Sequence, residues 1–428
     1  MPNHPMKICF VLGTRPEIIK LYSVMNAAAS HKEVTPVFIH TGQHYDYEMS
    51  QVFLEELKLP KCHYFLNIRS GPHGEQTAAL LTAIEKALVK ENPDTVVVVG
   101  DTNTAMAGAL AATKLHIPIT HVEAGCRSFD LDMPEEINRL TVDAVSSISF
   151  APSDVSALNL LFEGKPENRI FLAGNTVVDI VEETKELRKS LRLDDELKEG
   201  GTVVVTLHRP ENVDDKNRLE QLLQALAKIG ESIIFPIHPR TQKRIEEFDL
   251  QKMVDSYPLL HLVKPLRYLS FMKLLEDAKV VITDSGGVQE EAIMVGTPCV
   301  TARDTTEWPE TVWAGGNHLA GTKAENVTKL CKELLTKVSQ KAMPAKNPFK
   351  GNAGPTIIQI LHKLWKNGKL KSPKPDMTDG KYPLPWLISE KTQSKNDFYA
   401  TLRFNNKGQA IVEEDKATTH RIVRRSKR

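Results

Sequence analysis

The feature that most constrains the fold is the alternation of short apolar runs with amphipathic segments along most of the 428 residues. The runs are rich in β-branched residues and apolar throughout, which is typical of parallel strands covered by helices on both faces. After the first run, Ile18, Leu21, Tyr22 and Met25 follow the i, i+3, i+4, i+7 spacing of one helix face. The chain is therefore predicted to be α/β, with doubly wound parallel sheets.

The number of predicted strands indicates more than one sheet. The expected strands are residues 7–12, 34–40, 95–100, 118–124, 148–152, 170–174, 202–208, 232–238, 259–263, 280–284 and 298–302. These are too many for one compact sheet of usual size. A break is expected at residues 182–201, where charged residues crowd together. The chain length also fits two or three domains of about 100–200 residues.

We expect two Rossmann-like domains that face each other across a cleft, one over residues 1–173 and the other over residues 174–354. The helical pattern at residues 355–367 is expected to return to the N-terminal domain. Residues 368–428 form a basic tail dominated by Lys, Pro, Ser, Asp and Gly. Such a tail is predicted to be solvated and partly disordered, although basic tails can also bind anionic surfaces.

The overall charge argues against a nucleic-acid partner. Lys and Arg total 55 and Asp and Glu total 54, which leaves a formal charge of +1. The balance hides an asymmetry, because the chain from Lys366 onward holds 15 basic and 7 acidic residues. No apolar run approaches the roughly 18–20 residues of a membrane span, so no membrane insertion is expected.

The cysteines indicate neither a disulfide framework nor a zinc site. They are odd in number, scattered, and without a CxxC pair: Cys9, Cys62, Cys126, Cys299 and Cys331. A reducing cytoplasm fits this usage best. No pair of His and acid has the spacing of metal ligands on one face, so no metal is expected.

Acidic residues follow successive strands of the first predicted sheet, where ligands of parallel sheets bind. Asp101 could simply cap the next helix, and Glu135 could simply complement a helix dipole. Glu123 ends an apolar strand, so it needs a partner such as Arg127 or a substrate. Together these acids are expected to share one cleft and to supply a general acid and base.

Other strand ends carry groups suited to phosphate. Arg15 opens the first helix, with Lys20 one turn later, although an arginine could equally pair with a surface carboxylate. In the second half, His208 and His238 follow two successive strands, each beside an arginine. The segment Ser285-Gly286-Gly287 joins a strand to a helix and would expose backbone N–H groups to phosphate, with Glu291 placed to accept ribose hydroxyls.

Nine motifs occur in order and together closely resemble the non-hydrolysing UDP-N-acetylglucosamine 2-epimerases, especially archaeal-type members. The resemblance covers about residues 6–366 and leaves the tail outside. The motifs are GTRPEIIK from Gly13, HTGQHYD from His40, GDTNT from Gly100, HVEAGCRSFD from His121, MPEEINR from Met133, GNTVVD from Gly174, TLHRPENVD from Thr206, HPRT from His238 and SGGVQEEA from Ser285.

The resemblance implies a two-domain fold of the glycosyltransferase-B type, a homodimer and a reaction without added cofactor. Family members interconvert UDP-N-acetylglucosamine and UDP-N-acetylmannosamine. The implied mechanism breaks the C1–O bond and removes the C2 proton, which leaves bound UDP and a 2-acetamidoglucal. UDP then adds back, with protonation on the opposite face of C2.

The resemblance also implies roles for individual residues. The catalytic positions are Asp101, Glu123, Glu135 and His208. The substrate-binding positions are Arg15, Lys20, Ser285, Gly286, Gly287 and Glu291. Which acid takes the C2 proton is left open.

Many bacterial members bind a second UDP-N-acetylglucosamine as an activator. The matching positions here are Gln43, His44, Arg69, Glu136 and His238. Two of them differ in local context, because Arg69 precedes Ser-Gly without a neighbouring glutamine and His238 lies in HPRT.

Trp308 stands where the common family pattern has Arg. The sequence TEW resembles relatives that epimerise UDP-2,3-diacetamido-2,3-dideoxyglucuronic acid, which is the alternative substrate. The indole could stack locally or change the sugar pocket. Further alternatives are a hydrolysing variant, a glycosyltransferase of the same fold, and a non-catalytic UDP-sugar-binding regulatory protein. The intact acids argue against the last two.

Overall fold

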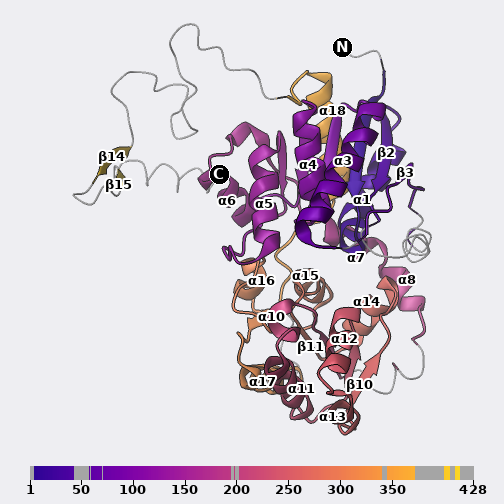
Figure 1. Cartoon of the computed structure of the whole chain (residues 1–428), viewed down its shortest axis with the longest axis vertical. Coiled ribbons are helices and arrows are strands. Elements are labelled where there is room, and N and C mark those ends of the chain that lie inside the picture. The colour runs from indigo at the N-terminus through magenta and orange to yellow at the C-terminus, as the bar shows by residue number, and fades with distance from the viewer. Residues whose placement is uncertain are drawn as a thin grey trace.

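The computed structural model describes residues 4–42, 57, 59–69, 71–193, 197, 202–339, 345–371, 400–404 and 410–414. It has two lobes, each built on a parallel sheet with helices packed on both faces (Figure 1). This arrangement confirms the predicted α/β class with two doubly wound units.

The first lobe contains the strands β1 (Met6–Leu12), β2 (Val34–His40), β3 (Tyr64–Phe65), β4 (Thr95–Val99), β5 (Ile119–Val122), β6 (Ile148–Ala151) and β7 (Ile170–Leu172). They form one parallel sheet in the order β3-β2-β1-β4-β5-β6-β7. The order reverses between β1 and β4, and ligands of such sheets bind outside the carboxyl ends of the strands at this point.

Both faces of the first sheet are buried. Along β1, Ile8, Phe10 and Leu12 point into one apolar core, while Cys9 and Val11 point into another. The strand therefore has apolar residues at every position instead of every second one.

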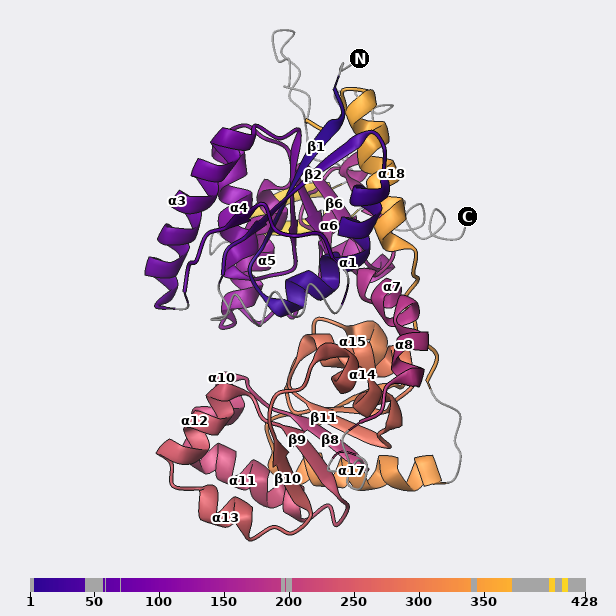
Figure 2. The ribbon, with the colours of Figure 1, turned by 90° about the vertical axis from the view of Figure 1, so that its right-hand side faces the viewer.

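Helices cover these two faces. They are α1 (Arg15–Ser30), α3 (His73–Glu91), α4 (Asn103–Lys114), α5 (Pro134–Val145) and α6 (Asp154–Phe162). A later helix, α18 (Ala353–Lys366), runs beside α1 (Figure 2). The two helices touch at Gly354, where an added Cβ would lie 2.4 Å from the carbonyl carbon of Ser23.

The second lobe contains the strands β8 (Val203–Thr206), β9 (Ile233–Pro236), β10 (Leu260–Val263), β11 (Val280–Thr283), β12 (Cys299–Thr301) and β13 (Asn317–Leu319). They form a parallel sheet in the order β10-β9-β8-β11-β12-β13, which reverses between β8 and β11. The helices of this half are α8 (Lys185–Ser190), α10 (Pro210–Val213), α11 (Lys216–Ala227), α12 (Pro239–Glu247), α13 (Gln251–Asp255), α14 (Tyr268–Asp277), α15 (Gly286–Val295), α16 (Pro309–Trp313) and α17 (Ala324–Ser339). The helix α7 (Thr176–Glu183) lies at the boundary, where it packs against α1 and α18 of the first lobe and α15 of the second.

Two segments cross between the lobes side by side. The N–H of Asn175 donates to the carbonyl of Lys350 at 2.8 Å. Gly174 has a φ of 92°, and a Cβ there would lie 2.6 Å from the same carbonyl oxygen, so this crossing requires glycine.

The predicted strands are all confirmed, with ends within two residues of those observed. β3 and β13 were not predicted, because two or three residues are too few to show a pattern. In the tail, β14 (Ala400–Phe404) and β15 (Ala410–Glu414) form an antiparallel pair. Among the described residues, no helix is both long and apolar enough to span a bilayer.

Candidate active site

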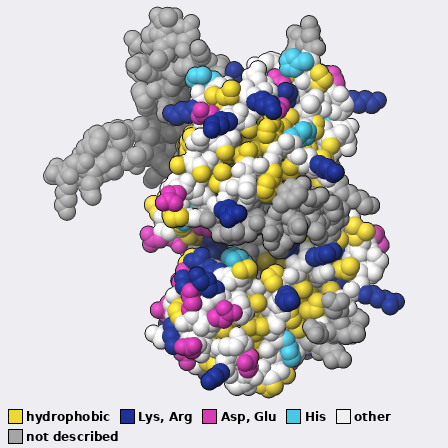
Figure 3. Space-filling model, turned by 45° about the vertical axis from the view of Figure 1, so that its right-hand side comes forward, with side chains coloured by type: hydrophobic (Ala, Val, Ile, Leu, Met, Phe, Trp, Pro, Cys, Tyr) yellow, Lys and Arg dark blue, Asp and Glu magenta, His cyan; other side chains and the backbone are white. Residues whose placement is uncertain are grey.

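The candidate site lies between the lobes, where the carboxyl ends of the two sheets face each other. Asp101 and Glu123 follow β4 and β5 of the first lobe, while His208 and Asp284 follow β8 and β11 of the second. Figure 3 shows Lys and Arg side chains and a histidine gathered along the waist between the lobes. The motifs predicted to carry chemistry thus meet at one boundary.

Glu123 forms an ion pair with Lys20 of α1, with Nζ 2.5 Å from Oε1. Its backbone is left-handed, with a φ of 66°, which costs about 1–3 kcal/mol for a residue other than glycine. The suggestion that Arg127 neutralises Glu123 is wrong. The guanidinium of Arg127 instead binds Asp143 at 2.7 Å and Glu163 at 2.6 Å.

Burial and neighbouring charges set the protonation of this pair. Burial raises the pKa of Glu123 by more than Lys20 lowers it, and the Asp101 carboxylate raises it further. Burial lowers the pKa of Lys20, but attraction to Glu123, Asp101 and Glu290 outweighs burial and raises it overall. A carboxyl with a raised pKa holds a proton more readily than a free one, which suits a group that takes up and releases a proton in general acid–base catalysis.

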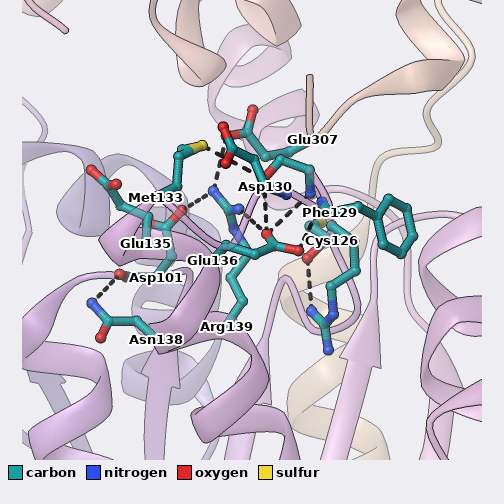
Figure 4. A network of polar contacts seen from close by, with 12 residues as sticks. Asp101, Cys126, Phe129, Asp130, Met133, Glu135, Glu136, Asn138, Arg139 and Glu307 are labelled. Atoms are coloured by element: carbon teal, nitrogen blue, oxygen red, sulfur yellow. Dashed lines mark hydrogen bonds and ion pairs between the residues drawn. The ribbon is translucent and has the colours of Figure 1, made fainter. Parts of the chain in front are cut away.

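Arg139 of α5 is the centre of a buried network of acids (Figure 4). Its Nη2 lies 2.6 Å from Asp101 Oδ2 and 3.0 Å from Glu307 Oε1, and its Nη1 lies 2.5 Å from Glu136 Oε2. Glu307 belongs to the second lobe, where Arg303 Nη1 also binds it at 2.9 Å. Arg139 thereby joins the acids of the first lobe to the second lobe.

Asp101 is not a helix cap, although capping would have explained it. Thr102 caps α4, and its hydroxyl accepts the N–H of Ala105 at 3.0 Å. Burial raises the pKa of Asp101, but the charges of Arg139 and Lys20 outweigh burial and hold the pKa below its usual range. Asp101 is therefore ionised, whereas the pKa of Glu123 is raised. Two strand-end acids with pKa values pushed apart are the pattern of an acid–base pair.

His208 is oriented by the fully buried Asp284, with Nδ1 3.1 Å from Oδ1. The same carboxylate accepts the N–H groups of His208 and Arg209 at 2.9–3.1 Å and the amide of Asn212 at 3.0 Å. Burial raises the pKa of Asp284, but His208 and these hydrogen bonds outweigh it and lower the pKa. An ionised Asp284 makes Nδ1 of His208 the donor and fixes the ring. The ring of His238 lies 5.2 Å away, centroid to centroid.

Glu135 reaches from the start of α5 to the second lobe. Its Oε1 lies 2.8 Å from Nη1 of Arg209. The third predicted acid therefore lies at the same boundary as Asp101 and Glu123, but paired with a cation from the opposite lobe.

The N-terminus of α15 presents backbone N–H groups at the same boundary. Ser285 is the N-cap residue, and Gly286 and Gly287 form the first turn. A Cβ on Gly286 would lie 3.4 Å from Glu307 Oε2, whereas one on Gly287 would meet only Ser285 Oγ, at 4.0 Å. Small residues thus leave this end of the helix open to an anion.

Cations of α1 face the next turn of α15. Burial raises the pKa of Glu291 to about 7, while the charges of Arg15 and Lys20 act to lower it. Arg15 also donates from Nη1 to the carbonyl of Leu266 in the second lobe, at 2.9 Å. The first-lobe residues predicted to bind substrate are therefore close to those of the second lobe.

The positions matched to an activator site have different surroundings. Gln43 and His44 lie outside the described residues. Arg69 is exposed in the loop before α3. Glu136 is buried, and both of its oxygens are engaged by the preceding loop and by α5.

Trp308 is 2% exposed and packs edge-to-face on Phe349, with ring centroids 5.5 Å apart at 83°. This edge-to-face contact shows that the ring packs locally. The indole Nε1 also lies 3.6 Å from where a Cβ on Gly286 would be. Among the described residues, no group of three or more His, Cys, Asp or Glu side chains could hold a metal ion.

Several residues of this site were not singled out from the sequence: Arg139, Asp284, Glu290 and Glu307. Arg139, for example, meets Glu307 from 168 residues away in the chain. Asp284 did carry a usable signal, because it is an acid directly after an apolar strand, as Glu123 is.

Comparisons with known proteins agree on one family. A family model described as UDP-N-acetylglucosamine 2-epimerase matches residues 26–362. A relative of that name from Methanocaldococcus jannaschii is 47% identical over 371 residues, covering 83% of this chain and 99% of the relative. A Pseudomonas aeruginosa relative named UDP-2,3-diacetamido-2,3-dideoxy-D-glucuronate 2-epimerase is 41% identical over 343 residues, covering 78% and 94%. The crystal structure of the M. jannaschii UDP-GlcNAc 2-epimerase in complex with UDP-GlcNAc and UDP has a TM-score of 0.78 at 45% identity, covering 84% of this chain and 100% of that one.

Proposed function

This chain belongs to the UDP-N-acetylglucosamine 2-epimerase family, and on that basis we propose that it interconverts UDP-N-acetylglucosamine and UDP-N-acetylmannosamine. The observation that carries the proposal is the juxtaposition across the lobes. The Glu123–Lys20 pair and the Asp101–Arg139 pair face the N-terminus of α15 and the Asp284–His208 pair.

The reaction proceeds by elimination and re-addition. The C2 proton passes to a base, the C–H electron pair forms the C1=C2 bond of a 2-acetamidoglucal, and UDP leaves with the C1–O electron pair. UDP then adds to C1 while C2 receives a proton on the opposite face. Asp101 and Glu123 supply one ionised carboxyl and one with a raised pKa, which together suit removal and return of a proton.

UDP is held by the second lobe. The N–H groups at Ser285, Gly286 and Gly287 bind a phosphate, and Glu291 accepts the ribose hydroxyls. His208, oriented by Asp284, stabilises the charge that develops on the leaving diphosphate. Arg15 and Lys20 supply cations from the first lobe.

The lobes close over the substrate in this proposal. Arg139–Glu307 and Arg209–Glu135 are the ion pairs that favour the closed arrangement. Closure excludes water from the glycal intermediate and completes the site from two halves.

The enzyme acts in the cytoplasm as a homodimer, by analogy with its family. The free state of all five cysteines supports a reducing compartment. Activation by a second UDP-N-acetylglucosamine stays a prediction, to be tested by whether the rate depends sigmoidally on substrate concentration.

One of the similar proteins favours a second candidate substrate. The P. aeruginosa relative at 41% identity is named for UDP-2,3-diacetamido-2,3-dideoxy-D-glucuronate. The local stacking of Trp308 on Phe349 gives that alternative no added support.

The test is proton NMR of the purified protein with UDP-N-acetylglucosamine in heavy water. We expect UDP-N-acetylmannosamine, with deuterium at C2 of the sugar pool. Release of free N-acetylmannosamine with equal UDP would identify the hydrolysing variant. No reaction here, with turnover of the diacetamido-uronate, would establish that alternative. Binding of UDP without turnover of either sugar would indicate a regulatory protein.

A further inference from the structure

A buried network of charged side chains lies behind the two strand-end acids. Asp143 of α5 accepts from three groups: Nδ1 of His121 at 2.6 Å, the N–H of Gly125 at 3.0 Å and Nη2 of Arg127 at 2.7 Å. His121 and Asp143 side chains are 0% and 3% exposed. Neither side chain has a role in the proposed reaction.

His121 links this network to the turn that carries Asp101. Its second ring nitrogen, Nε2, lies 3.0 Å from the carbonyl oxygen of Gly100. Gly100 has a φ of 66°, and Asp101 follows it directly. The position of that carbonyl therefore bears on the direction in which the Asp101 side chain leaves the sheet.

The partners of His121 determine its charge. One ring nitrogen faces a carboxylate and the other faces a backbone carbonyl, and neither of these oxygens can donate a hydrogen bond. Both contacts are hydrogen bonds only when both nitrogens carry protons. Arg127 Nη2 at 2.7 Å and the Gly125 N–H at 3.0 Å both donate to Asp143 and favour its ionised form independently of His121. Glu163 neutralises the second cation, Arg127.

The carboxylate of Asp143 thus holds both turns that carry the proposed catalytic acids, Asp101 and Glu123. Asp143 holds the Gly125 N–H, two residues after the left-handed Glu123, and holds the Gly100 carbonyl through His121. We propose that His121, kept as an imidazolium by Asp143, is a positioning residue for epimerisation that fixes the turn carrying Asp101. This inference rests on the proposed function for its kinetic test, but not for its spectroscopic one.

The spectroscopic test uses the full chain labelled with ¹⁵N in its histidine rings. We expect both ring nitrogens of His121 to carry protons at neutral pH, as its two acceptor contacts require, with the signals assigned by their loss in His121→Gln. His63 is the internal contrast, because its Nδ1 accepts the N–H of Phe38 at 3.1 Å. An unprotonated ring nitrogen in His121 at neutral pH would overturn the proposal.

The kinetic test compares two amides. In His121→Gln, the side-chain amide nitrogen occupies the position of Nε2 and can still donate to the Gly100 carbonyl. In His121→Asn, the shorter side chain brings its amide nitrogen only to the position of Nδ1. His121→Asn should lower kcat by up to about 10²-fold, the usual cost of misplacing a reacting group by about 1 Å, with the Kd of UDP within twofold of wild type. His121→Gln should keep several-fold more activity than His121→Asn. Because Gln also fills more of the histidine volume than Asn, His121→Met separates the two roles: it fills that volume without an N–H donor and should be as slow as His121→Asn. Equal activity of His121→Met and His121→Gln would show a volume-filling role and overturn the proposal.

The control is His318→Gln, at a half-buried histidine of β13 in the second lobe, which should keep kcat within twofold. Equal activity of His121→Asn and wild type would overturn the positioning role. If wild-type protein turns over neither sugar nucleotide, the proposed function fails, while the ring-protonation result still decides the charge of His121.

Discussion

Arg139 and Glu307 form an ion pair across the boundary between the lobes, with Nη2 3.0 Å from Oε1. The same Nη2 lies 2.6 Å from Asp101, so the second lobe shares the cation that holds a proposed catalytic acid. The charge of Glu307 acts to raise the pKa of Asp101, against the lowering effect of Arg139. Separation of the lobes would therefore change the electrostatics of Asp101 as well as the access of substrate.

Replacing Asp101 by Asn should abolish most turnover while UDP still binds. The amide cannot ionise or exchange a proton with C2, and loss of a general acid or base typically lowers rates by about 10²–10⁴-fold. The UDP contacts proposed for α15 are untouched. Steady-state kinetics and calorimetric titration with UDP check this, and wild-type kcat in Asp101→Asn would show that the acid cluster is misassigned. Glu123→Gln, measured alongside, identifies which acid exchanges the C2 proton.

Replacing Glu307 by Gln should destabilise the protein and slow the reaction. Arg139 and Arg303 would keep buried charges with fewer partners, and breaking a buried ion pair costs about 3–5 kcal/mol. Urea unfolding measures the loss. Removal of this nearby negative charge should also move the pKa assigned to Asp101 in the pH–rate profile downward.

The matched control for Glu307 is Glu310→Gln. Glu310 also bridges the lobes, through a hydrogen bond from the Ser153 hydroxyl, but it does not contact Arg139. It should keep kcat near wild type. Equal losses of kcat in Glu307→Gln and Glu310→Gln would show that general lobe contact, and not the shared arginine, is responsible.

Glu291 should make stability fall as pH rises. Burial raises its pKa from 4.5 to about 7, so its stabilising contribution is full below about pH 4.5 and is lost as pH rises through about 7. Between pH 6 and 8, wild type should lose about 1 kcal/mol of unfolding free energy relative to Glu291→Gln. If the unfolding free energies of wild type and Glu291→Gln changed equally with pH, this prediction would be wrong.

The same titration should appear in UDP binding. An ionised Glu291 accepts ribose hydroxyl protons better than a protonated one, so wild-type affinity for UDP should decrease from pH 8 to pH 6. Glu291→Gln should bind more weakly and with less pH dependence. Both proteins carry the same histidines, so the difference between them isolates Glu291.

Replacing Gly354 by Ala should weaken the packing of α18 on α1. The new methyl group would lie 2.4 Å from the carbonyl carbon of Ser23, and overpacking of this kind costs about 1–3 kcal/mol. Gly74→Ala, in α3 with no atom within 4 Å, is the matched control and should lose no stability. Thermal or urea unfolding of the two variants checks the contrast, and equal stabilities would show that the helices separate without penalty.

The local pattern of the sequence was sufficient for the fold class and for the positions of most strands. Residues 8–12 are apolar at every position because β1 is buried on both faces, and that composition differs from both a helix and a half-exposed strand. The strands β3 and β13 could not be predicted from the sequence, because a strand of two or three residues shows no periodic pattern.

The sequence alone also placed Asp101 near Glu123, and His208 near Ser285. Each pair follows strands of one parallel sheet, and the carboxyl ends of parallel strands share an edge of that sheet. The two pairs belong to different sheets, so their meeting depends on how the lobes face each other. Only the tertiary structure decided which charges pair: Lys20 and not Arg127 neutralises Glu123, and Arg139 meets Glu307 from 168 residues away. The physical reason is the difference in the distance along the chain over which the two effects act. Strand formation depends on neighbouring residues, whereas an ion pair depends on a few ångströms of separation set by the path of the whole backbone.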